Sequence, residues 1–212
     1  RAAARRAPGA IAVADITSAL TYRRLFAGSA LLARQFRSLL APGTERVGVL
    51  LPNVNATPVT LLALWSLGKV PAVLNYTTGP AIMLTCARLA GLKRIVTSRA
   101  FVEKAKLKLD PLAAAGIELL YLEDIRPRIS PLAKLAAFAG LLRLPHPPRT
   151  DAAATAIVLF TSGSEGVPKG VELTHANLLA NVRQMLAISD LDDRDRMFCA
   201  LPLFHSFGLT AG

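Results

Sequence analysis

Short apolar runs alternate with longer segments of helical periodicity along most of this 212-residue chain. This order constrains the fold strongly, because strands separated by helices favour a largely parallel sheet that helices cover. We expect strands at residues 47–51, 72–74, 94–97, 118–122, 156–161, 170–173 and 197–200. We expect helices at residues 21–40, 55–67, 80–90, 101–109, 131–144 and 176–189. The sequence therefore predicts an α/β fold.

Residues 161–170, which read TSGSEGVPKG, join two of the predicted strands. Glycine lets a backbone approach a ligand closely, and successive N–H groups in such a loop form a concave anion site. Hydroxyl groups add further donors, and one lysine adds a positive charge. The loop therefore predicts a polyphosphate site, whose candidate ligands are Thr161, Ser162, Gly163, Ser164, Glu165, Gly166, Pro168, Lys169 and Gly170.

Other kinds of loop compete with this interpretation. A Walker loop places its lysine directly after a glycine and before a serine or threonine, but here the lysine follows Pro168 and precedes a glycine. The hydrolase elbow G-x-S-x-G nearly fits residues 162–166, but the first position is Ser162 and the loop leads into a strand instead of a helix. A hydrolase that uses Ser164 and His205, and an ordinary glycine–serine hairpin, stay as alternatives.

The loop resembles the phosphate loop of the adenylate-forming superfamily, which includes acyl-CoA and acyl-carrier-protein synthetases, luciferases and peptide-synthetase adenylation domains. Other blocks resemble the same superfamily in the expected order, namely residues 47–53 (VGVLLPN), 68–75 (GKVPAVLN) and 201–209 (LPLFHSFGL). The resemblance implies that residues 1–212 are the first part of the large N-terminal, AMP-binding domain. It also implies that the C-terminal half of this domain and a small C-terminal domain are absent, so that the chain alone does not catalyse the full reaction.

The chain resembles one branch of the superfamily more than the others. Residues 164–166 (SEG) stand where most members have Thr-Thr-Gly, and they occur together with residues 121–126, 178–181 and 202–208. This combination resembles the acyl-[acyl-carrier-protein] synthetase part of bacterial 2-acylglycerophosphoethanolamine acyltransferase fusions. The resemblance implies a ligase that uses ATP and Mg²⁺ to activate a fatty acid, then passes the acyl group to acyl carrier protein for lysophospholipid reacylation. A fatty acyl-CoA synthetase, and a non-catalytic module that binds nucleotide or carrier protein, are the alternatives.

The resemblance also implies roles for single residues. Lys169 and His205 are the catalytic candidates, with the loop holding the β- and γ-phosphates of ATP and His205 at the acyl-carboxylate end of the pocket. The implied substrate-binding residues are Phe204, His205, Phe207 and Gly208. No metal ligand is expected here, because the Mg²⁺ ligands would lie mostly beyond residue 212. From the residues alone, a histidine with aromatic neighbours in the sequence is more often a packed core residue than a catalytic one, so a core position stays an alternative for His205.

The chain is strongly basic, with a formal net charge of +11 and a pI near 10.5. An arginine-rich genome explains this charge as well as an acidic partner does, such as ATP, acyl carrier protein or anionic lipid. The apolar helix expected at 131–144 has cations around it and could lie in a membrane interface. Because Lys134 and Arg143 fall on opposite sides of that helix, a buried helix with charged ends is favoured. Nucleic-acid binding is excluded, since no basic stripe alternates with aromatic residues. We expect a cytoplasmic protein, either peripheral on the inner face of a bacterial inner membrane or part of a membrane fusion protein.

Other segments give structural predictions. Cys86 and Cys199 lie in apolar segments without a metal-ligand spacing, so we expect buried, reduced thiols. The uncharged run 47–68 contains two prolines and two asparagines, which break it into strand, turn and helix and exclude a transmembrane span. The last helix has Thr174 as its expected N-cap and carries an apolar stripe that we expect in the core, formed by Leu178, Val182, Met185, Leu186 and Ser189.

Overall fold

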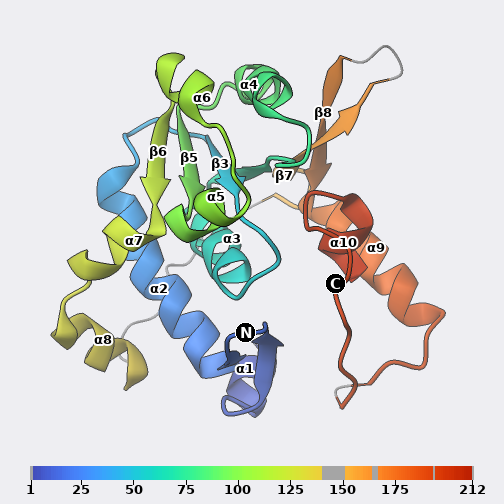
Figure 1. Cartoon of the computed structure of the whole chain (residues 1–212). Helices are drawn as coiled ribbons and strands as arrows, with labels where there is room; N and C mark the ends of the chain where they lie inside the picture. Colours follow the sequence, from blue (N-terminus) through green and yellow to red (C-terminus); the bar gives the residue numbers. More distant parts are fainter. Residues whose placement is uncertain (1, 140–150, 164–166, 193, 212) are drawn as a thin grey trace.

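The computed structural model describes residues 2–139, 151–163, 167–192 and 194–211. The main sheet of this described part has the strand order β6-β5-β3-β4-β7-β8 (Figure 1). Neighbours from β6 to β7 run parallel, and β8 pairs antiparallel with β7 at one edge. The predicted α/β class with a largely parallel sheet is therefore confirmed. The strands are β3 Arg46–Leu50, β4 Val70–Val73, β5 Arg94–Thr97, β6 Glu118–Tyr121, β7 Thr155–Ser162 and β8 Pro168–Thr174.

Helices cover both faces of this sheet. They are α2 Tyr22–Leu39 and α3 Ala56–Ser66 on one face, and α4 Pro80–Leu89 and α6 Asp110–Ala114 on the other. Successive side chains of a strand point to opposite faces, so Val49 of β3 joins the first apolar cluster and Leu50 joins the second. Both side chains are fully buried, which explains why the central strands are continuous apolar runs in the sequence.

Two close contacts fix the centre of the sheet. A Cβ atom on Gly48 of β3 would lie 2.6 Å from Cγ1 of Ile95 and 3.0 Å from Cδ1 of Leu92, so only glycine fits there without a shift of its neighbours. Trp65 of α3 donates a 2.7 Å hydrogen bond from its indole N–H to the carbonyl of Ala156 in β7. This bond ties α3 to the strand that leads into the predicted phosphate loop.

Most predicted elements agree with the structure to within two residues at each end. The run 47–68 is strand, turn and helix, as expected. The shortest elements were not predicted, because they are too short to show a clear periodicity. They are α1 Ala2–Arg6, β1 Ile11–Ala14, β2 Ala19–Thr21, α7 Leu122–Ile125, the 3₁₀ helix η1 Arg126–Arg128 and α10 Ser206–Ala211. The remaining elements, which overlap predicted helices, are α5 Arg99–Lys104, α8 Pro131–Phe138 and α9 His175–Ala187.

Two predicted elements were wrong. No strand forms at residues 197–200, since this segment pairs with no neighbouring strand and Phe198 is 91% exposed. The helix expected at 101–109 ends at Lys104, because Lys106 adopts a positive φ of 51° that a helix does not accommodate.

Two burial predictions also need correction. No residue of α9 is buried, and Leu186 of the expected core stripe is 50% exposed, although Leu178 does contact the main apolar cluster. Thr174 caps α9 as predicted, since its hydroxyl accepts the Asn177 N–H and the Asn177 side chain accepts the Thr174 N–H. Cys86 is buried as expected, but Cys199 is only half-buried.

The helix α8 is not the buried helix that the sequence favoured. Only Ala137 is buried in it, against Ala27 and Leu31 of α2, while Leu132 and Leu135 are exposed. Its described part ends at Phe138, and residues 140–144 of the predicted helix lie outside the described residues. In the part of the chain that the structure describes, no helix combines the length and the apolar character needed to cross a membrane.

Two glycine variants test the packing at the centre of the sheet. We expect Gly48→Ala to lower the free energy of unfolding by about 1–3 kcal/mol, because the added methyl group collides with Ile95. We expect Gly28→Ala to raise it by roughly 0.5–1 kcal/mol, because Gly28 is inside α2. Its Cβ would meet Val59 at an ordinary 3.6 Å. Urea unfolding followed by circular dichroism measures both, and equal effects of the two variants would contradict this packing.

Candidate functional site

The predicted phosphate loop connects β7 and β8 at the tip of an antiparallel hairpin, which projects at the upper right of Figure 1. Thr161 and Ser162 end β7 and are exposed, and Thr161 pairs with Lys169 across the hairpin. The chain enters a strand after the loop, which is the strand–loop–strand order that the sequence indicated. A hydrolase elbow would lead into a helix.

Gly163 closes the base of the loop. Its N–H donates to the carbonyl of Val167 at 3.1 Å, and a Cβ atom on it would lie only 2.2 Å from that carbonyl oxygen. The Cε atom of Lys169 lies 3.5 Å from the same position, so the lysine side chain reaches across to the base of the loop. Exposed hydroxyls, a lysine and a glycine without room for a Cβ atom are therefore brought together at the base of the loop.

The other predicted loop residues divide into two groups. Ser164, Glu165 and Gly166 lie outside the described residues. Pro168 and Gly170 lie in β8, where they pair with Ser162 and Phe160 as part of the hairpin.

The predicted acyl-end residues lie in the turn before α10, which holds Phe204 and His205, and in α10 itself, which holds Phe207 and Gly208. Phe204 is buried and packs edge-on against Tyr76, with ring centroids 5.1 Å apart, while Tyr76 packs in the same way against Phe101 at 5.0 Å. The ring of His205 lies 4.7 Å from that of Phe204 and is exposed, so His205 is not a core histidine. Phe207 is also exposed.

Gly208 has a packing role that the sequence did not reveal. It is buried in α10, and a Cβ atom on it would lie 2.4 Å from the carbonyl oxygen of Pro202. The helix α10 therefore rests directly on the turn that precedes His205.

Asn53 is a site residue that sequence reasoning missed. Its carboxamide N–H group donates to the carbonyls of Leu201 at 2.8 Å and Cys199 at 3.3 Å, and its Oδ1 accepts the N–H of Leu203 at 3.1 Å. The sequence held one signal for it: Asn53 comes shortly after the buried strand β3, and functional side chains of parallel sheets gather where the strands end. Its partners lie about 150 residues further along the chain, so the contact itself was not readable.

The half-buried Cys199 contributes to the same turn. Its Sγ lies 3.3 Å from the carbonyl oxygen of Leu201 and 3.6 Å from that of Gly208. Burial raises the pKa of the Cys199 thiol, so it stays protonated at neutral pH and can donate to these carbonyls.

Both groups of residues lie at the carboxyl edge of the parallel strands. Asn53 follows β3, Tyr76 follows β4 and the phosphate loop follows β7, and these three strands are neighbours in the sheet. Among the described residues, no hydrogen bond joins the loop to the His205 turn. The two groups thus follow neighbouring strands along one edge of the sheet.

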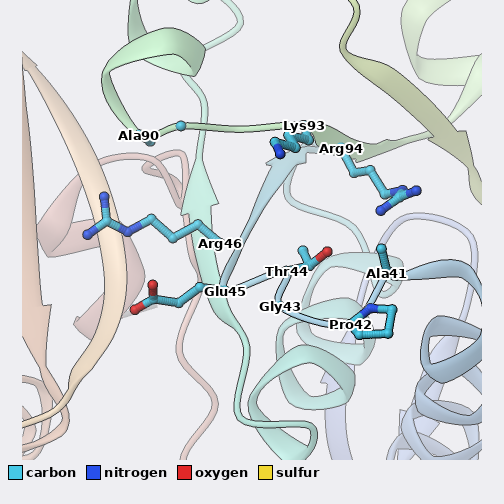
Figure 2. Close-up of a pocket in the computed structure, with 10 residues that line it drawn as sticks. Ala41, Pro42, Gly43, Thr44, Glu45, Arg46, Ala90, Lys93 and Arg94 are labelled. Atoms are coloured by element: carbon cyan, nitrogen blue, oxygen red, sulfur yellow. The ribbon is translucent and has the colours of Figure 1, made fainter.

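The structure also has a cavity of about 510 Å³ at the opposite edge (Figure 2). It is lined by residues 41–46, 90–91 and 93–94, at the amino ends of β3 and β5. Arg46 and Arg94 line it, but they already pair with Glu172 and Glu118. No predicted site residue lies there. Within the described ranges, no three His, Cys, Asp or Glu side chains are grouped so that they could hold a metal ion.

Comparison with known proteins shows to which family the chain belongs. The family described as AMP-binding enzyme matches residues 1–212. The chain belongs to this family. Sulfoacetate–CoA ligase of Cupriavidus necator is 30% identical over 199 residues, which cover 92% of this chain and 37% of that protein. A feruloyl-CoA synthase of an Amycolatopsis species is 32% identical over 207 residues, which cover 97% of this chain and 38% of that protein.

Solved structures agree with the fold of this AMP-binding chain. VinN in complex with 3-methylaspartate has a TM-score of 0.81 at 19% identity, covering 99% of this chain and 55% of VinN. The o-succinylbenzoate CoA synthetase of Bacillus subtilis, solved with ATP and a magnesium ion, has a TM-score of 0.77 at 23% identity, covering 98% and 40%. A benzoate CoA ligase from Burkholderia xenovorans has a TM-score of 0.76 at 25% identity, covering 96% and 39%. The chain spans well under half of the length of the two curated relatives, the sulfoacetate–CoA ligase and the feruloyl-CoA synthase.

The geometry at Gly163 gives a test of the phosphate loop. We expect Gly163→Ala to weaken ATP binding about tenfold or more, because the new methyl group would open the turn at Val167. Gly170→Ala has a smaller effect, since its Cβ would meet Leu89 at an ordinary 3.5 Å. Isothermal titration with ATP measures both affinities, and equal affinities for the two variants would contradict the role of the turn.

Proposed function

We propose that this AMP-binding chain is the first part of the large N-terminal domain of a ligase that activates a carboxylic acid with ATP and forms an acyl thioester. The observation that carries the proposal is the hairpin loop, in which Gly163 has no room for a side chain and Lys169 reaches the base of the turn. Backbone N–H groups, hydroxyl groups and the lysine side chain of such a loop are donors that suit the phosphates of ATP.

The chemistry proceeds in two steps. A carboxylate oxygen attacks the α-phosphorus of ATP, the bond from that phosphorus to the bridging oxygen of the β-phosphate breaks, and pyrophosphate leaves. A thiol sulfur then attacks the acyl carbon of the adenylate, the thiol loses its proton and AMP leaves. Lys169 and the N–H groups of the loop stabilise the charge that builds up on the departing pyrophosphate.

The acid would bind near the turn before α10. The exposed imidazole of His205 is available to the acyl carboxylate, and the exposed ring of Phe207 suits the wall of an acyl channel. Phe204 is packed against Tyr76, so it anchors the turn.

Members of this family use Mg²⁺ with ATP, and the ion would neutralise phosphate charge. The described residues offer no group of acidic side chains that could hold it, so its protein ligands would come from elsewhere.

We propose a fatty acid as substrate and acyl carrier protein as thiol acceptor, with lysophospholipid reacylation as the final use. Residues 164–166 (SEG) and 202–208 (PLFHSFG), which resemble the corresponding acyl-carrier-protein synthetases, support this choice. A CoA ligase is the second candidate, because curated relatives are named as ligases that form CoA thioesters.

Further sequence would be needed for activity. Large apolar side chains are exposed on α9 and on the segment that follows it, including Leu179, Leu186, Ile188 and Phe198. Exposed apolar side chains that form a large patch are usually covered by another part of a protein or by a partner, and we propose that these side chains are covered in this way. The short span relative to the curated relatives supports the same proposal.

We also propose that the protein is cytoplasmic and peripheral at an anionic membrane. The net charge of +11 and the exposed leucines of α8 support this placement. Failure to sediment with phosphatidylglycerol vesicles would exclude it.

The test of the function is ATP–pyrophosphate exchange with the full-length protein and a panel of fatty and aromatic acids. We expect exchange that depends on a fatty acid and that falls about 10²–10³-fold in Lys169→Ala, because the leaving pyrophosphate loses a charged donor. His205→Ala should reduce exchange while ATP binding is kept.

Three outcomes separate the alternatives. Exchange followed by acyl transfer to CoA but not to acyl carrier protein would select the CoA ligase. Exchange only with aromatic acids would exclude the fatty-acid substrate. ATP binding without exchange for any acid would contradict the enzyme and leave a nucleotide-binding module.

A further inference from the structure

The turn that carries His205 has little support of its own. Residues 195–200 have no regular structure, and residues 201–205 form only a bend and a turn before α10. The backbone bonds to His205 are local: its N–H donates to the carbonyl of Pro202 at 3.0 Å, and its carbonyl accepts the N–H of Leu209 in α10 at 2.9 Å. The position of His205 therefore depends on contacts from other parts of the fold.

Asn53 supplies these contacts through both ends of its carboxamide. The amino group binds the carbonyls of Leu201 and Cys199, and the oxygen binds the N–H of Leu203. A carboxamide suits this place because it donates and accepts at once. An aspartate has the same shape, but it would set an oxygen against the carbonyl oxygens of Leu201 and Cys199.

Two further contacts hold the same turn. Tyr76, which follows β4, packs against Phe204, and Gly208 lets α10 approach the carbonyls of Leu201 and Pro202. The turn is thereby fixed to the ends of two adjacent parallel strands. Of the groups in this turn, the imidazole of His205 stays exposed.

We propose that Asn53 is the positioning residue for the acid-binding end of the site. It acts through the backbone of residues 199–203 and sets His205 relative to the carboxyl edge of the sheet. This inference rests on the proposed function, and it adds a residue whose side-chain hydrogen bonds among the described residues go to residues 199–203 and not to the hairpin strands beside the loop.

Asn55 provides a matched control two residues further on. Its carboxamide also donates to a backbone carbonyl, that of Ser18 at 2.8 Å, but it ties the β1–β2 turn and does not touch residues 199–205. Asn53→Ala and Asn55→Ala thus each remove a carboxamide that bridges distant segments. Of these two variants, only Asn53→Ala removes the hydrogen bonds that hold the turn before His205.

The kinetic test uses the full-length protein in the pyrophosphate-exchange assay. For Asn53→Ala we expect kcat/KM for the acid to fall at least tenfold, while the Kd for ATP changes less than twofold. Asn53→Asp should lose at least as much as Asn53→Ala. Asn55→Ala should keep its kcat/KM within twofold, with any change confined to thermal stability. Parallel losses for ATP and acid in Asn53→Ala, or equal losses in both alanine variants, would overturn the proposal.

A double variant asks whether Asn53 acts through His205. If it does, adding Asn53→Ala to His205→Ala should lower kcat/KM by less than twofold more, because the positioned group is already missing. A further tenfold loss would contradict this route.

A measurement without substrates separates this inference from the proposed function. In hydrogen–deuterium exchange we expect the amides of residues 199–209 to exchange at least tenfold faster in Asn53→Ala than in Asn55→Ala. Unchanged protection of that segment would overturn the positioning role even in an active enzyme. If the wild type shows no exchange activity, the function fails, and this measurement still decides whether Asn53 holds the turn.

Discussion

Parallel pairing of β3, β4 and β7 brings the carboxyl ends of three neighbouring strands to one edge of the sheet. The pairing is possible because these strands are apolar on both faces, and helices cover each face. Asn53, Tyr76 and the phosphate loop follow these strands, so their common location is a consequence of topology. The contact between Trp65 and Ala156 fixes the amino end of β7 to the core, and the other end of this strand leads into the loop.

The two ends of the site differ in how they are built. The phosphate loop is a local structure, closed by the bond between Gly163 and Val167 and flanked by the exposed hydroxyls of β7. The His205 turn is a tertiary structure, held by side chains that come from far earlier in the chain. Under the proposed function, phosphate binding and placement of the acid would therefore depend on different residues.

The same difference explains what the sequence could predict. The α/β class and the strand–loop–strand order were predictable, since strand and helix periodicity and the Gly-Ser-Lys composition are local signals, and the phosphate-binding role of the loop stays a prediction. Asn53 was not, because its partners lie about 150 residues away in the sequence. The expected strand at 197–200 was wrong because an apolar run still needs a paired strand. The stripe of α9 has the period of a core helix, yet nothing in the described part of the chain covers Leu186.

The central claim is that the hairpin loop holds the polyphosphate of ATP, and an acyl-phosphate derivative of ATP tests it most directly. Such a probe transfers its acyl group to a lysine beside the terminal phosphates, and peptide mapping identifies the labelled residue. We expect Lys169 to be labelled, with labelling suppressed by unmodified ATP. Labelling of Lys93, which lines the cavity at the opposite edge of the sheet, with Lys169 unlabelled, would contradict the claim.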